Sequence, residues 1–269
     1  MKLSNLLLSL TVASVVGGPA VAEQPKPASD SFQPMDVFGL EWASDPQISP
    51  DGSRIAYVRN SMDVMKLYAA AGYVVLYSNP RGSTSYGEEF GNLIHHAYPG
   101  HDYDDLMSAV DAVVARGYVD TDNLFVTGGS GGGVLTAWIV GKTDRFRAAV
   151  SAKPVINWHS FVLTSDVPSL FVRYWFPAPP WERPEEYLRR SPLSLVGNVK
   201  TPTMLLTGEA DYRTPISESE QLYEALKLRK VDTALVRVPE ASHALIGRPS
   251  QLIAKIAHIL AWFEKYRKR

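Results

Sequence analysis

A serine enclosed by five glycines lies in the middle of this sequence, in the stretch VTGGSGGGVLTAWIVG at residues 126–141. The preceding run, residues 123–128, has the composition of a buried strand, and the following run has the apolar spacing of a helix. A flexible linker does not lie between a buried strand and an apolar helix. The chain is therefore expected to turn sharply from a strand into a helix at Ser130.

Two phosphate-binding motifs fail to fit this stretch. Gly141-Lys142-Thr143 resembles the end of a P-loop, but that motif needs a glycine five positions before Gly141, where the chain has Thr136. No G-x-G-x-x-G can be placed on the glycines either. The pattern that fits is G-x-S-x-G centred on Ser130, in the strand–turn–helix context that this motif requires.

The G-x-S-x-G motif predicts both a geometry and a chemistry. In so tight a turn, only hydrogen is expected to fit two positions before and two after the serine, at Gly128 and Gly132. The Ser130 hydroxyl then points out above the sheet as a nucleophile. The backbone N–H of Gly131 falls at a helix N-terminus, where it can donate to an oxyanion.

A serine nucleophile needs a base and an acid, and in this fold class the acid precedes the histidine along the chain. Of the six histidines, His243 falls in a loop just after a strand and is the best candidate for the base. His258 lies inside the last helix, where a buried structural role is expected. Asp211, deep in the loop after another strand, is favoured as the acid, and Glu209 is interpreted as a salt-bridge or capping residue.

Composition excludes other kinds of chemistry. The 269 residues carry a formal net charge of −1, so no basic surface for nucleic acid is expected. The chain has no cysteine, which excludes disulfides and thiolate catalysis. The stretch HHAYPGHDYDD, residues 95–105, has no compact metal-ligand spacing, so neither a metal nor another cofactor is expected.

The N-terminus predicts export. Residues 1–22 contain Lys2, an apolar run and a small-residue ending at Ala22, which is the pattern of a secretory signal peptide. The apolar run is too short and too interrupted for a membrane anchor. Residues 23–44 are expected to be a disordered lead-in. We therefore expect a periplasmic or secreted protein without membrane contact after cleavage.

Strands alternate with helices through the rest of the chain, after a short β unit at residues 45–60. This order predicts an α/β fold with a mostly parallel sheet flanked by helices. Residues 157–192 are aromatic and Pro-rich and are interpreted as an irregular insertion. The expected strands are 72–79, 123–128, 147–152, 201–208 and 233–239, and the expected helices besides the one after Ser130 are 103–117, 217–230 and 250–269.

Four stretches in order resemble the catalytic domain of the prolyl oligopeptidase family of serine peptidases, especially its acylaminoacyl-peptidase and dipeptidyl-peptidase-like branch. They are NPRGSTSYGEEF (79–90), DYDDLMSAVDAVVARGYVDTDNLFVTGGSGGG (102–133), LLTGEADYRTPISESEQLYEALK (205–227) and EASHAL (240–245). The resemblance implies an α/β-hydrolase domain at residues 66–269 that cleaves short peptides. It assigns Ser130 as nucleophile, Asp211 as acid and His243 as base.

The resemblance also suggests substrate contacts. Arg213 matches a position that often binds substrate carbonyls in the family, although an ion pair that shapes the loop explains it equally well. The stretch FVRYWFPAPPW (171–181) lies where the family builds its specificity pocket. Tyr174 and Trp175 are therefore candidate substrate contacts, with core or lid packing as the alternative.

Two departures from the family stand out. Its members carry a β-propeller, of which residues 45–65 look like one remaining blade fragment. They also have an H-G-G-type loop that completes the oxyanion hole, and this sequence contains no H-G-G. The chain thus resembles a member with a large internal deletion, in which the N-terminal part of the sheet is incomplete.

Three functions stay open at this point. The first is a serine peptidase acting on short peptides through an acyl-enzyme on Ser130, impaired by the missing oxyanion loop. The second is an esterase on small acyl esters. The third is a non-catalytic remnant that binds peptides. The sequence does not predict an oligomeric state.

Overall fold

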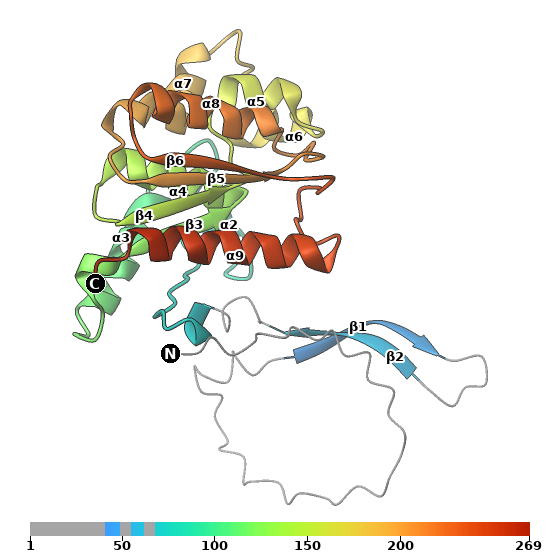
Figure 1. The fold of residues 1–269 in the computed structure, drawn as a ribbon. Coiled ribbons are helices and arrows are strands. Elements are labelled where there is room, and N and C mark those ends of the chain that lie inside the picture. Colours follow the sequence, from blue (N-terminus) through green and yellow to red (C-terminus); the bar gives the residue numbers. More distant parts are fainter. Residues whose placement is uncertain (1–40, 49–54, 62–67) are drawn as a thin grey trace, which may run out of the picture. The chain divides into compact units, whose positions relative to one another are not determined.

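The computed structural model describes residues 41–48, 55–61 and 68–269, which belong to two compact units, Met1–Tyr73 and Val74–Arg269 (Figure 1). In the first unit, strands β1 (Glu41–Ile48) and β2 (Ile55–Ser61) pair in antiparallel orientation. β1 begins inside the range expected as a disordered lead-in. The expected signal peptide lies outside the described residues, and the blade fragment stays a prediction.

The second unit contains a parallel sheet whose described strands follow the order β3-β4-β5-β6. The register sets Phe125 opposite Ala148, and Thr203 opposite both Ala149 and Thr233. The structure confirms the four strands predicted after residue 120 and the α/β fold class. The strands are β3 (Phe125–Gly129), β4 (Ala148–Ala152), β5 (Thr203–Gly208) and β6 (Thr233–Val238).

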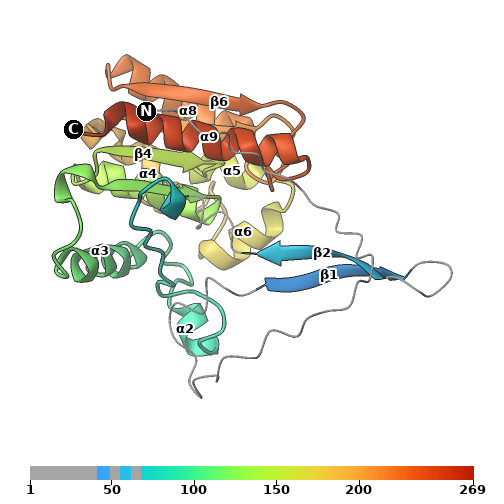
Figure 2. The same ribbon diagram turned by 60° about the horizontal axis from the view of Figure 1, so that its bottom comes forward.

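Helices pack on both faces of this sheet. Neighbouring residues of a strand point to opposite sides, and in β3 two neighbouring residues are both apolar. Phe125 stacks on Phe263 of α9 (Pro249–Tyr266), with ring centroids 4.8 Å apart. The next residue, Val126, packs in a core cluster with side chains of α4 (Gly131–Lys142) and α8 (Ile216–Leu228). α9 therefore covers one face, and α4 and α8 cover the other (Figures 1 and 2).

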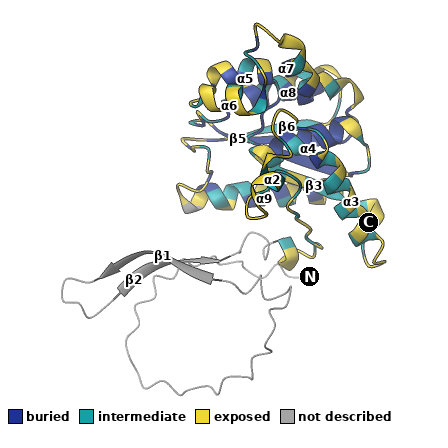
Figure 3. Cartoon of the chain, turned by 180° about the vertical axis from the view of Figure 1, so that it is seen from behind, coloured by how far each residue is buried: buried dark blue, intermediate teal, exposed yellow. Residues whose placement is uncertain are grey.

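Helix α4, which follows Ser130, is buried on nearly all sides (Figure 3). A helix that is apolar all round is stable only inside a protein. Its buried side chains fix the direction in which the chain leaves the Ser130 turn. They include Val134, Ala137, Trp138, Ile139 and Val140.

The aromatic insertion is helical, so the prediction of an irregular segment was wrong. It forms α5 (Trp158–Thr164), α6 (Pro168–Trp175) and α7 (Pro184–Arg190), followed by the 3-10 segment η3 (Pro192–Asn198). The Asn157 side chain caps α5, and prolines open α6 and α7 at a position where their missing N–H costs nothing. Its aromatic side chains build a second core with Tyr98, comprising Trp158, Phe161, Phe176 and Tyr187.

The strand predicted at residues 72–79 does not form. Residues 73–80 have no regular secondary structure, and Val74 and Leu76 are 55% and 40% exposed. A strand is stable only when another strand satisfies its backbone groups. Among the described strands, β3 pairs with β4 alone, and no strand from before residue 125 joins this sheet.

The remaining helices follow the sequence patterns closely. The predicted helices at 103–117, 217–230 and 250–269 are confirmed as α3 (Asp102–Val114), α8 and α9, whereas the short helices α2 (Glu88–Asn92) and η2 (Thr121–Asn123) were not expected. His258 of α9 is exposed, so its expected burial was wrong. Within the part of the chain that the structure describes, no helix is both long and apolar enough to cross a membrane.

Candidate active site

Ser130 occupies the turn between β3 and α4 with backbone angles φ 59° and ψ −117°. A positive φ is uncommon for a residue with a side chain and stores strain in the turn. Two backbone hydrogen bonds hold the turn. The Ser130 N–H donates to Ala152 O at 3.0 Å, and the Val134 N–H donates to Ser130 O at 2.9 Å. The sharp turn expected from the glycines is therefore present.

The glycines that the turn requires are Gly128 and Gly133. A Cβ on Gly128 would lie 2.3 Å from Gly132 O, and a Cβ on Gly133 would lie 2.4 Å from Ala152 O. A Cβ on Gly132 would meet no atom within 4 Å. The expectation for Gly132 was wrong because α4 begins directly after Ser130. The turn of the helix directs position 133, and not position 132, toward Ala152 O at the end of β4.

Asp211 lies in the loop after β5 and is buried, with 3% of its surface exposed. Its carboxylate accepts hydrogen bonds from the backbone N–H groups of Arg213 at 3.0 Å and Thr214 at 2.9 Å. The Thr214 hydroxyl lies 3.0 Å from the other carboxylate oxygen. These contacts compensate for the hydration that a buried carboxylate loses.

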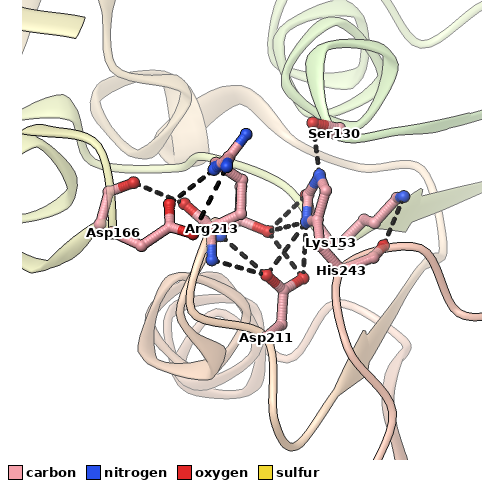
Figure 4. Close-up of polar contacts among 8 residues, drawn as sticks. Ser130, Lys153, Asp166, Asp211, Arg213 and His243 are labelled. Carbon is pink, nitrogen blue, oxygen red and sulfur yellow. Dashed lines mark hydrogen bonds and ion pairs between the residues drawn. The ribbon is translucent and has the colours of Figure 1, made fainter. Parts of the chain in front are cut away.

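His243 lies in the loop after β6 and connects Asp211 with Ser130 (Figure 4). Its Nε2 is 2.9 Å from Ser130 Oγ, and its Nδ1 is 2.8 and 3.0 Å from the two Asp211 oxygens. The structure thus brings together the three residues predicted as nucleophile, acid and base. With the imidazole proton on Nδ1, Asp211 accepts it and Nε2 is free to accept the serine hydroxyl proton.

Lys153 and Thr214 also belong to this cluster, although the sequence analysis missed both. The Lys153 ammonium donates to His243 O at 2.6 Å, and the Thr214 hydroxyl lies 3.2 Å from His243 Nδ1. Burial and the nearby Lys255 lower the pKa of Lys153, while Asp211 opposes that shift. The sequence offered one signal for Thr214, which is its position three residues after Asp211. Short polar side chains often form local hydrogen bonds in such loops.

Gly131, which the sequence predicts as an oxyanion donor, lies directly after Ser130. Gly131 is exposed and is the first residue of α4, so its N–H has no carbonyl within the helix to receive it. The buried Tyr98 hydroxyl donates to Gly131 O at 2.7 Å and fixes the next peptide group. Burial, and secondarily Asp102, raises the pKa of Tyr98, so this hydroxyl remains a donor over the physiological pH range.

Arg213 forms an ion pair with Asp166, from the segment between α5 and α6. Arg213 Nε is 2.6 Å from Asp166 Oδ1, and its hydrogen bonds lower the pKa of Asp166. The Ser165 hydroxyl also donates to Arg213 O, so the aromatic insertion is attached to the loop that carries Asp211. The pair borders an open cavity of about 370 Å³ lined by Asp166, Ala210, Tyr212, Arg213, Ser242, His243 and Ala244.

Tyr174 and Trp175 do not line the cavity beside His243. Consecutive residues of a helix point in different directions. Tyr174 is partly exposed and donates to Asn92 Oδ1 at 2.9 Å, whereas Trp175 packs against Tyr98 in the aromatic core, with ring centroids 4.9 Å apart. The structure therefore favours the packing interpretation for Trp175.

The other acidic and histidine residues weighed from the sequence lie apart from this cluster. Glu209 is exposed, and no ion pair involving it occurs among the described residues. His95 stacks on His96, and His101 pairs with Asp104 at the surface. Over residues 68–269, no group of three or more His, Cys, Asp or Glu side chains could hold a metal ion.

Comparison with known proteins connects this geometry to a family. The chain is 44% identical over 218 residues to an uncharacterized peptidase, YuxL, of Bacillus subtilis, covering 80% of this chain and 33% of the relative. It is 35% identical over 212 residues to an acylamino-acid-releasing enzyme of Arabidopsis thaliana, covering 76% of this chain and 28% of that enzyme. The chain therefore spans about a third of the length of these relatives.

Solved structures agree with the sequence matches. An uncomplexed acylaminoacyl peptidase of Pyrococcus horikoshii superposes with a TM-score of 0.74 at 27% identity, covering 80% of this chain and 35% of that protein. The fold is that of an α/β-hydrolase domain, as the resemblance implied. The sequence features of the prolyl oligopeptidase family match residues 59–269. The chain thus belongs to the prolyl oligopeptidase family.

Proposed function

We propose that this protein is a serine peptidase that hydrolyses short peptides through an acyl-enzyme on Ser130. The observation that carries the proposal is the continuous chain of hydrogen bonds from Ser130 Oγ through His243 to Asp211. A nucleophile, a base and an acid in this order are the elements of acyl transfer by a serine hydrolase.

The mechanism follows from these contacts. His243 Nε2 removes the hydroxyl proton as Ser130 Oγ attacks the substrate carbonyl, and the Asp211 carboxylate stabilises the resulting imidazolium. The Gly131 N–H donates to the oxyanion of the tetrahedral intermediate. The imidazolium then protonates the leaving amine, and a water molecule activated by the same base releases the acyl group from Ser130.

Peptide substrates are supported by two observations. Another solved acylaminoacyl peptidase, 27% identical and with a TM-score of 0.74, is in complex with the peptide derivative Z-Gly-Gly-Phe-chloromethyl ketone. In this chain, the cavity of about 370 Å³ beside His243 is open to solvent and combines Tyr212 with the Arg213–Asp166 ion pair. Such a cavity can hold an amino-acid side chain or a short acyl group next to the nucleophile.

The oxyanion hole limits the rate that we expect. The sequence contains no H-G-G loop to supply a second donor beside Gly131. Loss of one oxyanion donor typically costs about 10²–10³ in turnover. We therefore infer that this chain hydrolyses peptides slowly.

The same limitation favours a second function, that of an esterase on small acyl esters. An activated ester has a good leaving group and needs less oxyanion stabilisation than an amide. Turnover of a matched pair, an activated ester and a peptidyl amide with the same acyl group, distinguishes these functions: measurable amide cleavage, even if slow, supports the peptidase, and ester hydrolysis without any amide cleavage supports the esterase. We expect weak ester hydrolysis, little amide cleavage and neither reaction in the Ser130→Ala variant. Activity that persists in Ser130→Ala would refute both functions.

The third possibility, a non-catalytic remnant that binds peptides, predicts a different result. An organophosphonate probe reacts far faster with an activated serine than with an ordinary hydroxyl, so a remnant would leave Ser130 unlabelled while still binding a short peptide. Slow labelling at Ser130 would exclude this alternative.

We also propose that the protein is exported to the periplasm or the medium, on the basis of the signal pattern in residues 1–22. Cell fractionation followed by intact-mass measurement tests this. We expect the exported chain to begin after Ala22, and a full-length chain confined to the cytoplasm would contradict the proposal.

A further inference from the structure

The Thr214 hydroxyl contacts both the acid and the base, and the mechanism above leaves it unused. Its oxygen lies 3.0 Å from Asp211 Oδ2 and 3.2 Å from His243 Nδ1. Thr214 is only 3% exposed, so water does not compete freely for these contacts. Most buried hydroxyls are hydrogen-bonded, and protein acceptors lie within reach of this one.

The hydroxyl has one proton and two candidate acceptors, Asp211 Oδ2 and Lys153 O at 3.1 Å. An ionised carboxylate is the stronger acceptor, since charge-assisted hydrogen bonds are roughly twice as strong as neutral ones. The His243 Nδ1 proton already points to the carboxylate at 2.8 Å. The hydroxyl therefore donates to Asp211 Oδ2 rather than to Lys153 O or to the imidazole.

This donation completes the set of contacts around the carboxylate. Asp211 Oδ1 accepts hydrogen bonds from the backbone N–H groups of Arg213 and Thr214. Both carboxylate oxygens of Asp211 lie within 3.0 Å of His243 Nδ1. Without the Thr214 hydroxyl, Oδ2 would keep only the imidazole as a partner among the described residues. The carboxylate would then be held firmly on one oxygen and loosely on the other.

We propose that Thr214 is a positioning residue, whose hydroxyl holds the Asp211 carboxylate in the plane that meets His243 Nδ1. This inference rests on the proposed function of Ser130, His243 and Asp211. Thr214 does not touch the reacting atoms, and it acts through Asp211.

Its place among the strand ends supports this role. Thr214 lies in the loop after β5, Lys153 directly follows β4, and His243 follows β6. Lys153 contacts both loops, because its carbonyl lies 3.1 Å from the Thr214 hydroxyl and its ammonium donates to His243 O. Small movements of a catalytic group are costly, so a residue that fixes the acid between the loops affects the rate.

Three variants test the proposal through the rate of labelling by an organophosphonate probe. Thr214→Val keeps the shape and removes the hydroxyl, and we expect labelling to slow about tenfold, as for a lost hydrogen bond to a charged group. Thr214→Ser keeps a hydroxyl and should restore most of the rate. Thr207→Val is the matched control, because the Thr207 hydroxyl on β5 is buried without a hydrogen-bond partner among the described residues.

Two further measurements separate positioning from a general structural effect. In an Asp211→Asn background, Thr214→Val should slow labelling no further, because the group on which it acts is already changed. The low-field proton resonance of His243 Nδ1–H should shift in Thr214→Val and return in Thr214→Ser. An additional loss in the Asp211→Asn background, or an unmoved resonance, would overturn the proposal.

The wild-type and Ser130→Ala proteins distinguish failure of this inference from failure of the proposed function. If wild type is labelled, Ser130→Ala is not, and Thr214→Val labels at the wild-type rate, the positioning role is wrong while the proposed function stands. If Ser130→Ala is labelled as fast as wild type, the proposed function itself is wrong, and the role of Thr214 is wrong with it.

Discussion

Residues 73–80 and strand β5 have similar apolar sequences, YVVLYSNP and TMLLTG, yet their environments are opposite. Every residue of β5 is buried between β4 and β6. Val74 and Leu76 are 55% and 40% exposed in a segment without regular structure. The difference shows that an apolar run becomes a strand only where neighbouring strands accept its backbone hydrogen bonds.

The same contrast decides which loops can hold the side chains of the candidate active site in fixed positions. Asp211 follows β5, whose register with β4 and β6 fixes the point at which the loop starts. Residues 73–80 have no such register. The next residue, Arg81, binds the Asp105 carboxylate through its guanidinium at 2.8 and 2.7 Å. Paired strands thus position Ser130, Asp211 and His243, and the unpaired segment contributes no side chain to this cluster.

The largest effect is expected where a paired strand ends. In the proposed mechanism, Asp211→Asn removes the charge that stabilises the His243 imidazolium, so turnover of an activated ester should fall by several orders of magnitude, about 10⁴. Circular dichroism should show that the fold persists. An unchanged rate would mean that Asp211 is not the acid, and that either Glu209 has this role or no residue has it.

The next effect compares the two apolar segments directly. Leu205→Ala in β5 opens a cavity in a fully buried strand and should lower the free energy of unfolding by about 2–5 kcal/mol. Leu76→Ala should change it by less than about 0.5 kcal/mol, because the side chain is already exposed. Urea titrations measure both values. Equal losses would mean that residues 73–80 pack in solution.

A third pair of variants tests the turn between β3 and α4. Gly133→Ala places a methyl group against Ala152 O and should destabilise the protein by about 1–3 kcal/mol. Gly132→Ala meets open space and should stabilise it by about 0.5–1 kcal/mol, since alanine favours a helix. Thermal melting distinguishes the two. If Gly132→Ala were the less stable of the two variants, the turn would require glycine at position 132 after all.

The smallest effect is expected at the surface pair beside the cavity. If Arg213 only shapes its loop, Asp166→Asn and Arg213→Met should raise KM by similar factors of about two to three, as exposed ion pairs are weak. If Arg213 binds a substrate carbonyl, Arg213→Met should raise KM well above the value for Asp166→Asn. Steady-state kinetics with a short peptidyl ester measures the difference.

The sequence predicted well what depends on local pattern. The four paired strands and the G-x-S-x-G turn are visible in composition and spacing, and the strand ends pointed to Asp211 and His243 before any contact was known. The order of acid and histidine after the serine followed from the fold class.

Features that depend on distant contacts could not be predicted in this way. Residues 73–80 would need a neighbouring strand, and none of the described strands pairs with them. The crowding at Gly133 comes from Ala152 O at the end of β4. The aromatic insertion was misread because its helices are short and packed by rings rather than by a regular apolar period. Thr214 and Lys153 carry no motif, and only the meeting of three strand ends reveals them.

The central claim is that His243, held by Asp211, activates Ser130 as a nucleophile. Intact-mass measurement after incubation with an organophosphonate probe, followed by peptide mapping, tests it most directly. We expect a single adduct on Ser130 that forms slowly or partially in the wild-type chain and is absent in Ser130→Ala and His243→Ala. An adduct on another residue, or undiminished labelling of Ser130 in His243→Ala, would contradict the claim.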